Sequence, residues 1–215
     1  EALPASVARL TALRKLTMQD CTSLKSVAAL PELMTQIGGY AFLDRLLAPS
    51  TCAFQGCASL ASITIPESVT QIGEYAFQGC ASLASITLPA SVTEIGERAF
   101  RGCASLASIT LPASVKQIGK EAFHGCTSLA SITIPESVTQ IGELAFLRCT
   151  SLASITLPAS VTRIGERAFE GCTSLASITL FAPVTEIGGR LFRQHLSGLR
   201  LARVDHAPRV GDADW

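Results

Sequence analysis

The chain has 215 residues, 48% of them hydrophobic and 6% aromatic, which is enough for a sizeable core and excludes a disordered or fibrous protein. Its 17 basic residues are balanced by 17 acidic ones, and it has no run of like charges that would attract nucleic acid or an anionic membrane. The uncharged stretch 75–93 contains glycine, proline and many hydroxyl side chains, so we predict no membrane span.

A repeat of 23 residues organises the chain and predicts one continuous solenoid domain. Its most regular marker is a cysteine at the same place in six units: Cys57, Cys80, Cys103, Cys126, Cys149 and Cys172. We predict three parts in chain order, with degenerate repeats over 1–56, six regular repeats over 57–194, and a capping coil with a tail over 195–215.

The first part, 1–56, matches the repeat only in pieces. LPASV at Leu3–Val7 and CTSLKSV from Cys21 are two such pieces. The dipeptides Ala41-Phe42 and Ala53-Phe54 are 12 residues apart, which predicts one shortened coil. We expect three leucines of that coil to line an apolar groove if the regular core has no place for them: Leu43, Leu46 and Leu47.

Each regular unit begins with a predicted strand. In the first unit Leu60, Ile63 and Ile65 point one way in an extended segment, and Ser62 and Thr64 point the other way. The apolar side chains should form the core, and the hydroxyl side chains should cover an outer face. Because one unit cannot bury its own apolar face, we expect the units to stack with their strands paired in parallel.

The rest of the unit is predicted to hold a bend and a short turn. After Pro66 ends the strand, Val69 and Ile72 supply a second apolar pair, and Gly73 permits a sharp bend. We expect Glu74–Phe77 to form a single helical or 3₁₀ turn, because Glu opens the equivalent segment in four of six units and Gly closes it in most.

The last part, 195–215, starts as a further coil. Leu196, Leu199 and Leu201 repeat the apolar spacing of a strand, whereas the tail from Asp205 has no repeat character. Arginines gather at this end, and we expect them either to cap the core with polar side chains or to contact a partner. The three that we single out as candidates are Arg190, Arg193 and Arg200.

The pattern L-x-x-I-x-[IL]-P-x-x-V-x-x-I-G-x-x-A-F-x-x-C resembles the Treponema pallidum-type, or BspA-like, leucine-rich repeat of bacterial and protist surface proteins. The resemblance implies a leucine-rich-repeat solenoid, mainly β, with a parallel β-sheet on one face and short strands and 3₁₀ or helical turns on the other. It also implies attachment to host or extracellular-matrix protein, a cell-surface, periplasmic or secreted location, and no enzymatic activity. No basic and apolar leader opens the given sequence at Glu1, so we expect no signal peptide within it.

One departure from the usual leucine-rich repeat lies after the strand, where a ladder of Asn residues is the norm and this chain has no Asn. Serines occupy that neighbourhood instead: Ser68, Ser91, Ser114, Ser137 and Ser160.

Neither the cysteines nor the histidines form a recognisable chemical motif. We expect the cysteines to be buried thiols, because no C-x-x-C pair is present to hold zinc. If a disulfide forms, Cys52 and Cys57 are the expected pair, since they lie outside the regular register. His124, His195 and His206 are expected to be solvated, and no G-x-S-x-G motif is present. We therefore predict no catalytic residue, cofactor or metal.

The strand face is predicted to be uniform. Its Ser62 and Thr64 recur at every repeat, and such a surface lacks the Trp, Tyr and Arg residues that dominate binding interfaces. Two interpretations remain open: a soluble face that favours β-structure, or a polar lattice for glycans or another regular surface.

Variation between units concentrates in the predicted turn, in two columns that start at Tyr75 and Gln78. One unit has Leu144 and Leu147 where most other units are polar or charged, and residues three apart on a helical turn share a face. We predict a contact patch there, with Tyr75 and Arg98 as further candidates. The predicted function is non-enzymatic protein binding, with adhesion implied by the resemblance. The alternative is a self-assembling scaffold, a homodimer through that patch.

Overall fold

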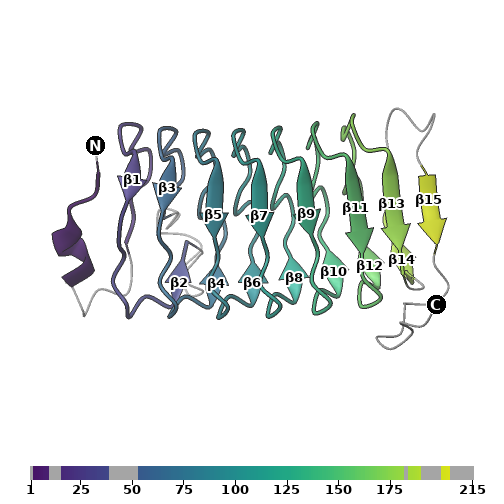
Figure 1. Ribbon diagram of the computed structural model, residues 1–215, viewed down its shortest axis with the longest axis horizontal. Helices are drawn as coiled ribbons and strands as arrows, with labels where there is room; N and C mark the ends of the chain where they lie inside the picture. Colours follow the sequence, from purple (N-terminus) through teal and green to yellow (C-terminus); the bar gives the residue numbers. More distant parts are fainter. Residues whose placement is uncertain (1, 10–15, 39–52, 182–183, 190–199, 204–215) are drawn as a thin grey trace, which may run out of the picture.

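The protein is an elongated solenoid in which short strands stack in two rows along the long axis (Figure 1). The computed structural model describes residues 2–9, 16–38, 53–181, 184–189 and 200–203. A single 3₁₀ helix, η1 (Ala5–Arg9), lies at one end of the described chain, and the last strand lies at the other. The predicted leucine-rich-repeat architecture, mainly β and almost without helix, is confirmed.

The odd-numbered strands form the first row, with exposed Ser and Thr on one side and buried Ile on the other. Their hydrogen-bonded ladder is divided into three parallel sheets, β1-β3, β5-β7-β9 and β11-β13-β15. The strands are β1 (Ser26–Val27), β3 (Ser62–Ile63), β5 (Ser85–Thr87), β7 (Ser108–Thr110), β9 (Ser131–Thr133), β11 (Ser154–Leu157), β13 (Ser177–Leu180) and β15 (Arg200–Arg203).

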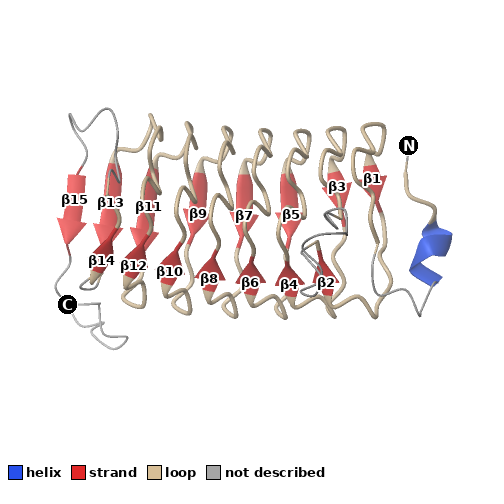
Figure 2. Cartoon of the chain, turned by 180° about the vertical axis from the view of Figure 1, so that it is seen from behind, coloured by secondary structure: helices blue, strands red, loops and turns tan. Residues whose placement is uncertain are grey.

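The even-numbered strands form the second row, which Figure 2 shows from behind. They contain two residues each, yet they make one continuous parallel sheet of seven strands. The strands are β2 (Gln36–Ile37), β4 (Gln71–Ile72), β6 (Glu94–Ile95), β8 (Gln117–Ile118), β10 (Gln140–Ile141), β12 (Arg163–Ile164) and β14 (Glu186–Ile187). Regular pairing joins residues 23 apart, as for Ile95 and Ile118, so each column of the repeat becomes a column in space.

Identical side chains therefore stack through the core. The phenylalanine rings from Phe54 to Phe169 form a continuous stack, with centroids 5.4–5.5 Å apart and planes within 8° of parallel. The cysteines from Cys57 to Cys172 are free, buried thiols, as predicted. Each donates to a backbone carbonyl of the preceding coil, as Cys103 Sγ does to Phe77 O. Cys57 is among them, so it is not paired with Cys52, which lies outside the described residues.

The serines that stand where an asparagine ladder is usual donate hydrogen bonds to backbone carbonyls of the preceding coil. Ser68 Oγ donates to Met34 O at 2.6 Å, and Ser91 Oγ donates to Val69 O at the same distance. Ser114 and Ser137 make the equivalent bond. The buried Ser160 Oγ has no partner among the described residues. The serines thus satisfy carbonyls at the bend that the β-ladders do not reach.

The glycine after each Ile of the second row is needed for close stacking. A Cβ on Gly119 would lie 2.6 Å from the carbonyl carbon of Gly96 and 2.8 Å from Glu97 N. Neighbouring coils approach backbone to backbone at this bend, so any larger residue would force them apart.

The shortened coil predicted between Phe42 and Phe54 falls largely on residues 39–52, which lie outside the described residues. Ser26 pairs with Ser62, and Gln36 pairs with Gln71, so strands 36 and 35 residues apart are direct neighbours. The turn position between these coils is held by Ala53 and Phe54, because Met18 N donates to Ala53 O and Phe54 N donates to Ala76 O. The paired strands here are thus farther apart in sequence than the 23 residues of the regular repeat. Leu43, Leu46 and Leu47, the predicted groove residues, lie outside the described residues.

Candidate functional site

The variable columns of the sequence lie on one feature of the solenoid, which we call the turn ridge: residues 74–79, 97–102, 120–125, 143–148 and 166–171. The ridge segments are consecutive turns and not a regular helix, although they contain the i→i+3 bonds of the expected single helical or 3₁₀ turn, such as that from Gln78 N to Tyr75 O at 3.1 Å. Tyr75 N donates to Glu97 O, Phe77 N to Ala99 O, and Gly79 N to Arg101 O, all at 2.8–2.9 Å. Alternate N–H groups thus bond the next coil, which a helix would have used internally.

Left-handed backbone conformations make this ladder possible. The first variable column has positive φ throughout, at Tyr75 (56°), Arg98 (54°), Glu121 (53°), Leu144 (58°) and Arg167 (55°). Gly79, Gly102, Gly125 and Gly171 adopt φ of 73–75° at the end of the turn, and Arg148 replaces glycine there at 59°. Bulky residues in this conformation carry backbone strain, which the inter-coil ladder holds in place.

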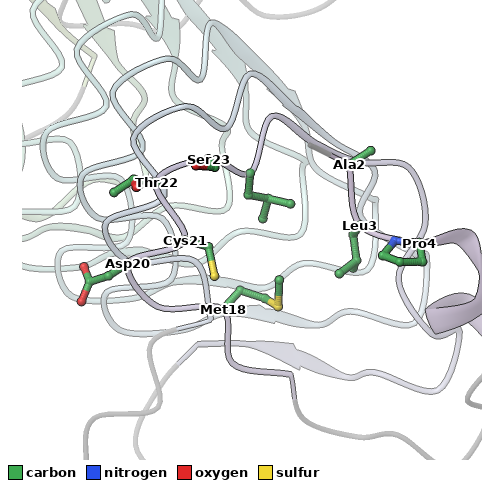
Figure 3. A pocket seen from close by; sticks show the side chains of 9 residues that line it. Ala2, Leu3, Pro4, Met18, Asp20, Cys21, Thr22 and Ser23 are labelled. Atoms are coloured by element: carbon green, nitrogen blue, oxygen red, sulfur yellow. The ribbon is translucent and has the colours of Figure 1, made fainter.

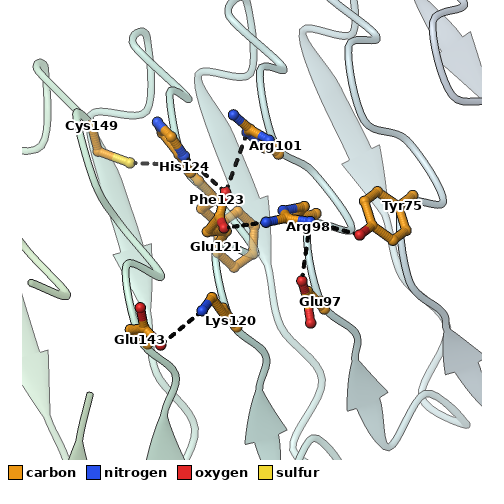
Figure 4. Close-up of polar contacts among 10 residues, drawn as sticks. All are labelled: Tyr75, Glu97, Arg98, Arg101, Lys120, Glu121, Phe123, His124, Glu143 and Cys149. Carbon is orange, nitrogen blue, oxygen red and sulfur yellow. Dashed lines mark hydrogen bonds and ion pairs between the residues drawn. The ribbon is translucent and has the colours of Figure 1, made fainter. Parts of the chain in front are cut away.

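Two predicted candidates, Tyr75 and Arg98, meet between the first two segments of the ridge (Figure 4). Arg98 Nη1 donates to Tyr75 Oη at 2.6 Å, and its guanidinium carbon lies 5.4 Å from the Tyr75 ring centroid. Arg98 Nη2 donates to Glu121 Oε1 at 2.7 Å. The bond with Glu121 is the main reason that the Arg98 pKa is raised. The three side chains come from three consecutive coils.

Glu121 is the charged residue buried most deeply among the described residues, with its side chain only 7% exposed. Besides Arg98, it contacts Arg101 Nε at 3.4 Å and His124 Nδ1 at 3.3 Å through Oε2. The bond from Arg98 lowers the pKa of Glu121 to about 2, against the opposing effect of burial. For His124 the effect of burial is the dominant one, and it lowers the pKa of the imidazole. Glu121 is therefore an anion that fixes two arginines.

Sequence reasoning missed Glu121 and Arg101 and expected His124 to be solvated, whereas His124 is half-buried against Glu121. The 23-residue register of the sequence could have revealed these contacts. Residues 23 apart are neighbours in a regular stack, so opposite charges at that spacing predict ion pairs. Among the described residues, three such pairs each join two successive coils: Arg98–Glu121, Lys120–Glu143 and Arg163–Glu186.

The leucine pair is less exposed than its sequence context predicts. Leu144 is half-buried, and Leu147 is only 9% exposed. At the same two positions of the neighbouring coils, Glu121 contacts His124 and Arg167 contacts Glu170, so the three-residue spacing does bring such side chains together. The expected outer patch is nevertheless small, because Leu147 is largely buried. Of the C-terminal arginines, Arg190 and Arg193 lie outside the described residues, and Arg200 begins β15.

The strand face has the predicted composition. Ser85, Thr87, Ser108 and Thr110 are exposed, as are their counterparts on β9. Among the described residues, no group of three His, Cys, Asp or Glu side chains is arranged to hold a metal ion, and no helix is long and apolar enough to cross a membrane.

A separate hollow of about 450 Å³ lies at the N-terminal end of the stack (Figure 3). Met18, Cys21 and Leu24 line it together with Leu3, and Asp20 is the single charged residue among those that line it. Its lining includes none of the residues of the cluster around Arg98.

Comparison with known proteins agrees with this architecture. The family model for the BspA type leucine rich repeat region matches residues 50–152 and 95–203. The crystal structure of the T. pallidum leucine rich repeat protein is similar, with 34% identity and a TM-score of 0.64 over 76% of this chain and 72% of that one.

Two other solved structures extend the likeness. A leucine-rich repeat protein from Bacteroides ovatus is 29% identical, with a TM-score of 0.61 over 87% of this chain. A leucine rich cell surface protein from Faecalibacterium prausnitzii is 28% identical, with a TM-score of 0.54 over 92%. This chain spans only 57% and 60% of those two proteins. No curated protein gives a significant match.

Leucine-rich repeat proteins generally bind other proteins or serve structural roles, and they are typically not enzymes. Proteins with BspA-like repeats are typically associated with the cell surface. The repeat pattern, the two rows of parallel strands and the family match lead to one conclusion: the chain belongs to the BspA-type leucine-rich repeat family.

Proposed function

We propose that the chain is a non-enzymatic protein-binding module that acts in adhesion, that its partner is a host or extracellular-matrix protein, and that it binds through the turn ridge. The observation that carries this proposal is the cluster around Glu121. It orders Tyr75, Arg98 and Arg101 on adjacent coils. Tyr and Arg are the residue types that contribute most to binding free energy at protein interfaces.

Preorganisation is what makes the cluster suited to binding. A free arginine loses side-chain entropy when a partner immobilises it, and that loss weakens association. Arg98 is already held by Glu121 on one side and by Tyr75 on the other, so a partner would meet a rigid surface. Arg101 is more exposed than Arg98 and has one long contact with Glu121, which leaves its other donors available.

The strand face is a less suitable binding surface for a partner protein than the turn ridge. From β5 to β9 it presents the same two hydroxyl residues on each coil, with no aromatic or charged side chain between them. A repeated surface of this kind cannot fix the register of one protein partner, whereas the ridge differs at every coil.

Self-assembly is the second function considered, through Leu144 and Leu147. With Leu147 only 9% exposed, that patch provides little apolar area, and stable homodimers bury large apolar surfaces. Adhesion through the arginine cluster is therefore the better-supported proposal.

The test begins with light scattering to establish the oligomeric state, followed by binding to immobilised matrix proteins such as laminin and collagen at physiological salt. Arg101→Ala should weaken saturable binding about tenfold or more, as expected for loss of an interface arginine. Arg163→Ala is the matched control, because Arg163 lies on β12, outside the ridge, where it is exposed and paired with Glu186 of β14.

Equal loss in both variants, or loss in neither, would contradict the ridge as the binding surface. A dimer that Leu144→Glu dissociates, without binding to any matrix protein, would instead support self-assembly. Thermal unfolding of each variant shows whether the fold is retained.

A further inference from the structure

A hollow of about 410 Å³ opens on the strand face, away from the turn ridge. It lies between β9 and β11, at the place where the hydrogen-bonded ladder of the first row is interrupted. Hydroxyl residues of both strands line it, namely Ser131, Thr133, Ser154 and Thr156. Its volume falls in the range of small-molecule sites.

Two side chains distinguish this hollow from the rest of the strand face. Phe181, from the segment after β13, lines it where the same position is proline in five other coils: Pro66, Pro89, Pro112, Pro135 and Pro158. Glu136, just after β9, contributes a carboxylate, and it is exposed. The hollow thus combines one aromatic ring, one carboxylate and several hydroxyls, which the uniform strand face does not do elsewhere between β5 and β9.

We propose that this hollow binds a neutral hexopyranose ring. The apolar C–H face of a sugar packs on an aromatic ring, and Phe181 together with Pro158 supplies an apolar wall. The sugar hydroxyls donate to the Glu136 carboxylate, and such charge-assisted bonds are stronger than bonds between neutral groups. Ser and Thr hydroxyls both donate and accept, so they match the remaining sugar oxygens.

The electrostatics of the lining exclude acidic sugars. None of the residues that line the hollow is basic, and Glu136 would repel a uronate or sulfate placed beside it. The proposal concerns a site other than the turn ridge, so it stands or falls independently of protein binding there.

The test uses saturation-transfer NMR with the methyl glycosides of glucose, galactose, mannose and N-acetylglucosamine, and with methyl glucuronide as the acidic probe. Concentrations up to about 50 mM are needed, because one ring in an open hollow binds with a Kd on the order of millimolar. At least one neutral glycoside should receive saturation on its ring protons, and the glucuronide should receive less.

Three variants locate the binding. Phe181→Pro restores the residue of the other coils and should weaken affinity at least about fivefold, and Phe181→Leu serves if the proline variant loses its fold. Glu136→Gln should weaken affinity about tenfold. The matched control is Glu67→Gln: Glu67 follows β3, where the ladder is also interrupted, but Pro112 stands at the position of Phe181.

Affinity that survives both the Phe181 and Glu136 substitutions overturns the proposal. So does the absence of saturation transfer from every neutral glycoside, or stronger binding of the glucuronide. Equal weakening by Glu67→Gln would show a general effect on the strand face and would also contradict the site.

Discussion

Arg98 and Glu121 occupy the same position of two neighbouring coils, and their side chains are joined by a hydrogen bond of 2.7 Å. Because the coils are in register, a residue whose charge changes in one repeat directly contacts the residue at the same position of the next repeat. Arg98, from the same column, and Arg101, from the second variable column, compensate the charge of a carboxylate that is only 7% exposed, and His124 contacts it from a third side.

The first prediction follows from this compensation. Glu121→Gln keeps the size of the side chain but removes the charge that pairs with Arg98 and Arg101. We expect the free energy of unfolding to fall by about 2 kcal/mol at neutral pH, measured by urea denaturation. Glu143→Gln is the control, because Glu143 is 43% exposed and pairs with Lys120 at the surface. Its expected loss is below about 1 kcal/mol, and losses of equal size would contradict a special role for Glu121.

The second prediction concerns pH. The pKa of Glu121 is lowered to about 2 in the folded protein, from the ordinary 4.5. A carboxyl group with a lowered folded pKa contributes stability above its unfolded pKa and loses that contribution as pH falls toward the folded value. The difference in unfolding free energy between wild type and Glu121→Gln should therefore be constant above about pH 5, shrink below 4.5 and vanish near 2. A difference that stays constant to pH 2.5 would show that Glu121 is not the titrating group.

The parts of the structure that the sequence predicts correctly are those set by periodicity. Leu60 and Ile63 are buried while Ser62 and Thr64 are exposed, because period-two alternation needs only a strand and a core on one side. The 23-residue register then places every column, which is why the phenylalanine and cysteine stacks could be expected.

The turn ridge could not be predicted in the same way. Glu74–Phe77 has the composition of a helical turn, but Tyr75 adopts φ of 56° so that its N–H can reach Glu97 O on the next coil. That bond depends on a neighbouring coil, and local preference within one unit does not contain it. The same reason explains the error for His124, whose environment is set by Glu121 through the fold of the turn.

The third prediction compares two glycines of one coil. Gly119→Ala would place a Cβ 2.6–2.8 Å from the backbone of the preceding coil, so we expect a loss of about 2–3 kcal/mol. Gly125→Ala meets nothing closer than 3.9 Å but has φ of 73°, so only the left-handed conformation is penalised, by about 1 kcal/mol. Urea denaturation of both variants gives the comparison. A smaller loss for Gly119→Ala would mean that the coils separate easily at the bend.

The fourth prediction is a gain in stability. Arg148 has φ of 59° at a position where four preceding coils and one following coil have glycine. Arg148→Gly removes the strain of a left-handed arginine, which exceeds the entropy cost of glycine, and should raise the free energy of unfolding by about 0.5–1 kcal/mol. Arg148→Ala is the control, since alanine keeps the strain and should give no gain. An equal gain from alanine would attribute the effect to the lost charge.

The fifth prediction concerns the buried cysteines at alkaline pH. Burial raises the pKa of Cys57 to about 11 and those of Cys80 and Cys126 to about 12, and it also raises that of Cys103. Above pH 9 the unfolded chain therefore releases thiol protons that the folded protein keeps, so the free energy of unfolding should fall as pH rises from about 9 toward 11.

Each such thiol contributes a slope of about 1.4 kcal/mol per pH unit, so Cys103→Ala should make the decline shallower by that amount, although it lowers stability at neutral pH through the lost side chain. The measurement is urea denaturation between pH 8 and 11 with a reducing agent present, which prevents disulfide formation. Ser105→Ala is the control, because Ser105 is exposed in the same coil and does not titrate in this range. If the free energies of unfolding of wild type and Cys103→Ala decline in parallel with pH, the Cys103 thiol must ionise in the folded protein as it does in the unfolded chain. Water would then have more access to the cysteine column than its burial indicates.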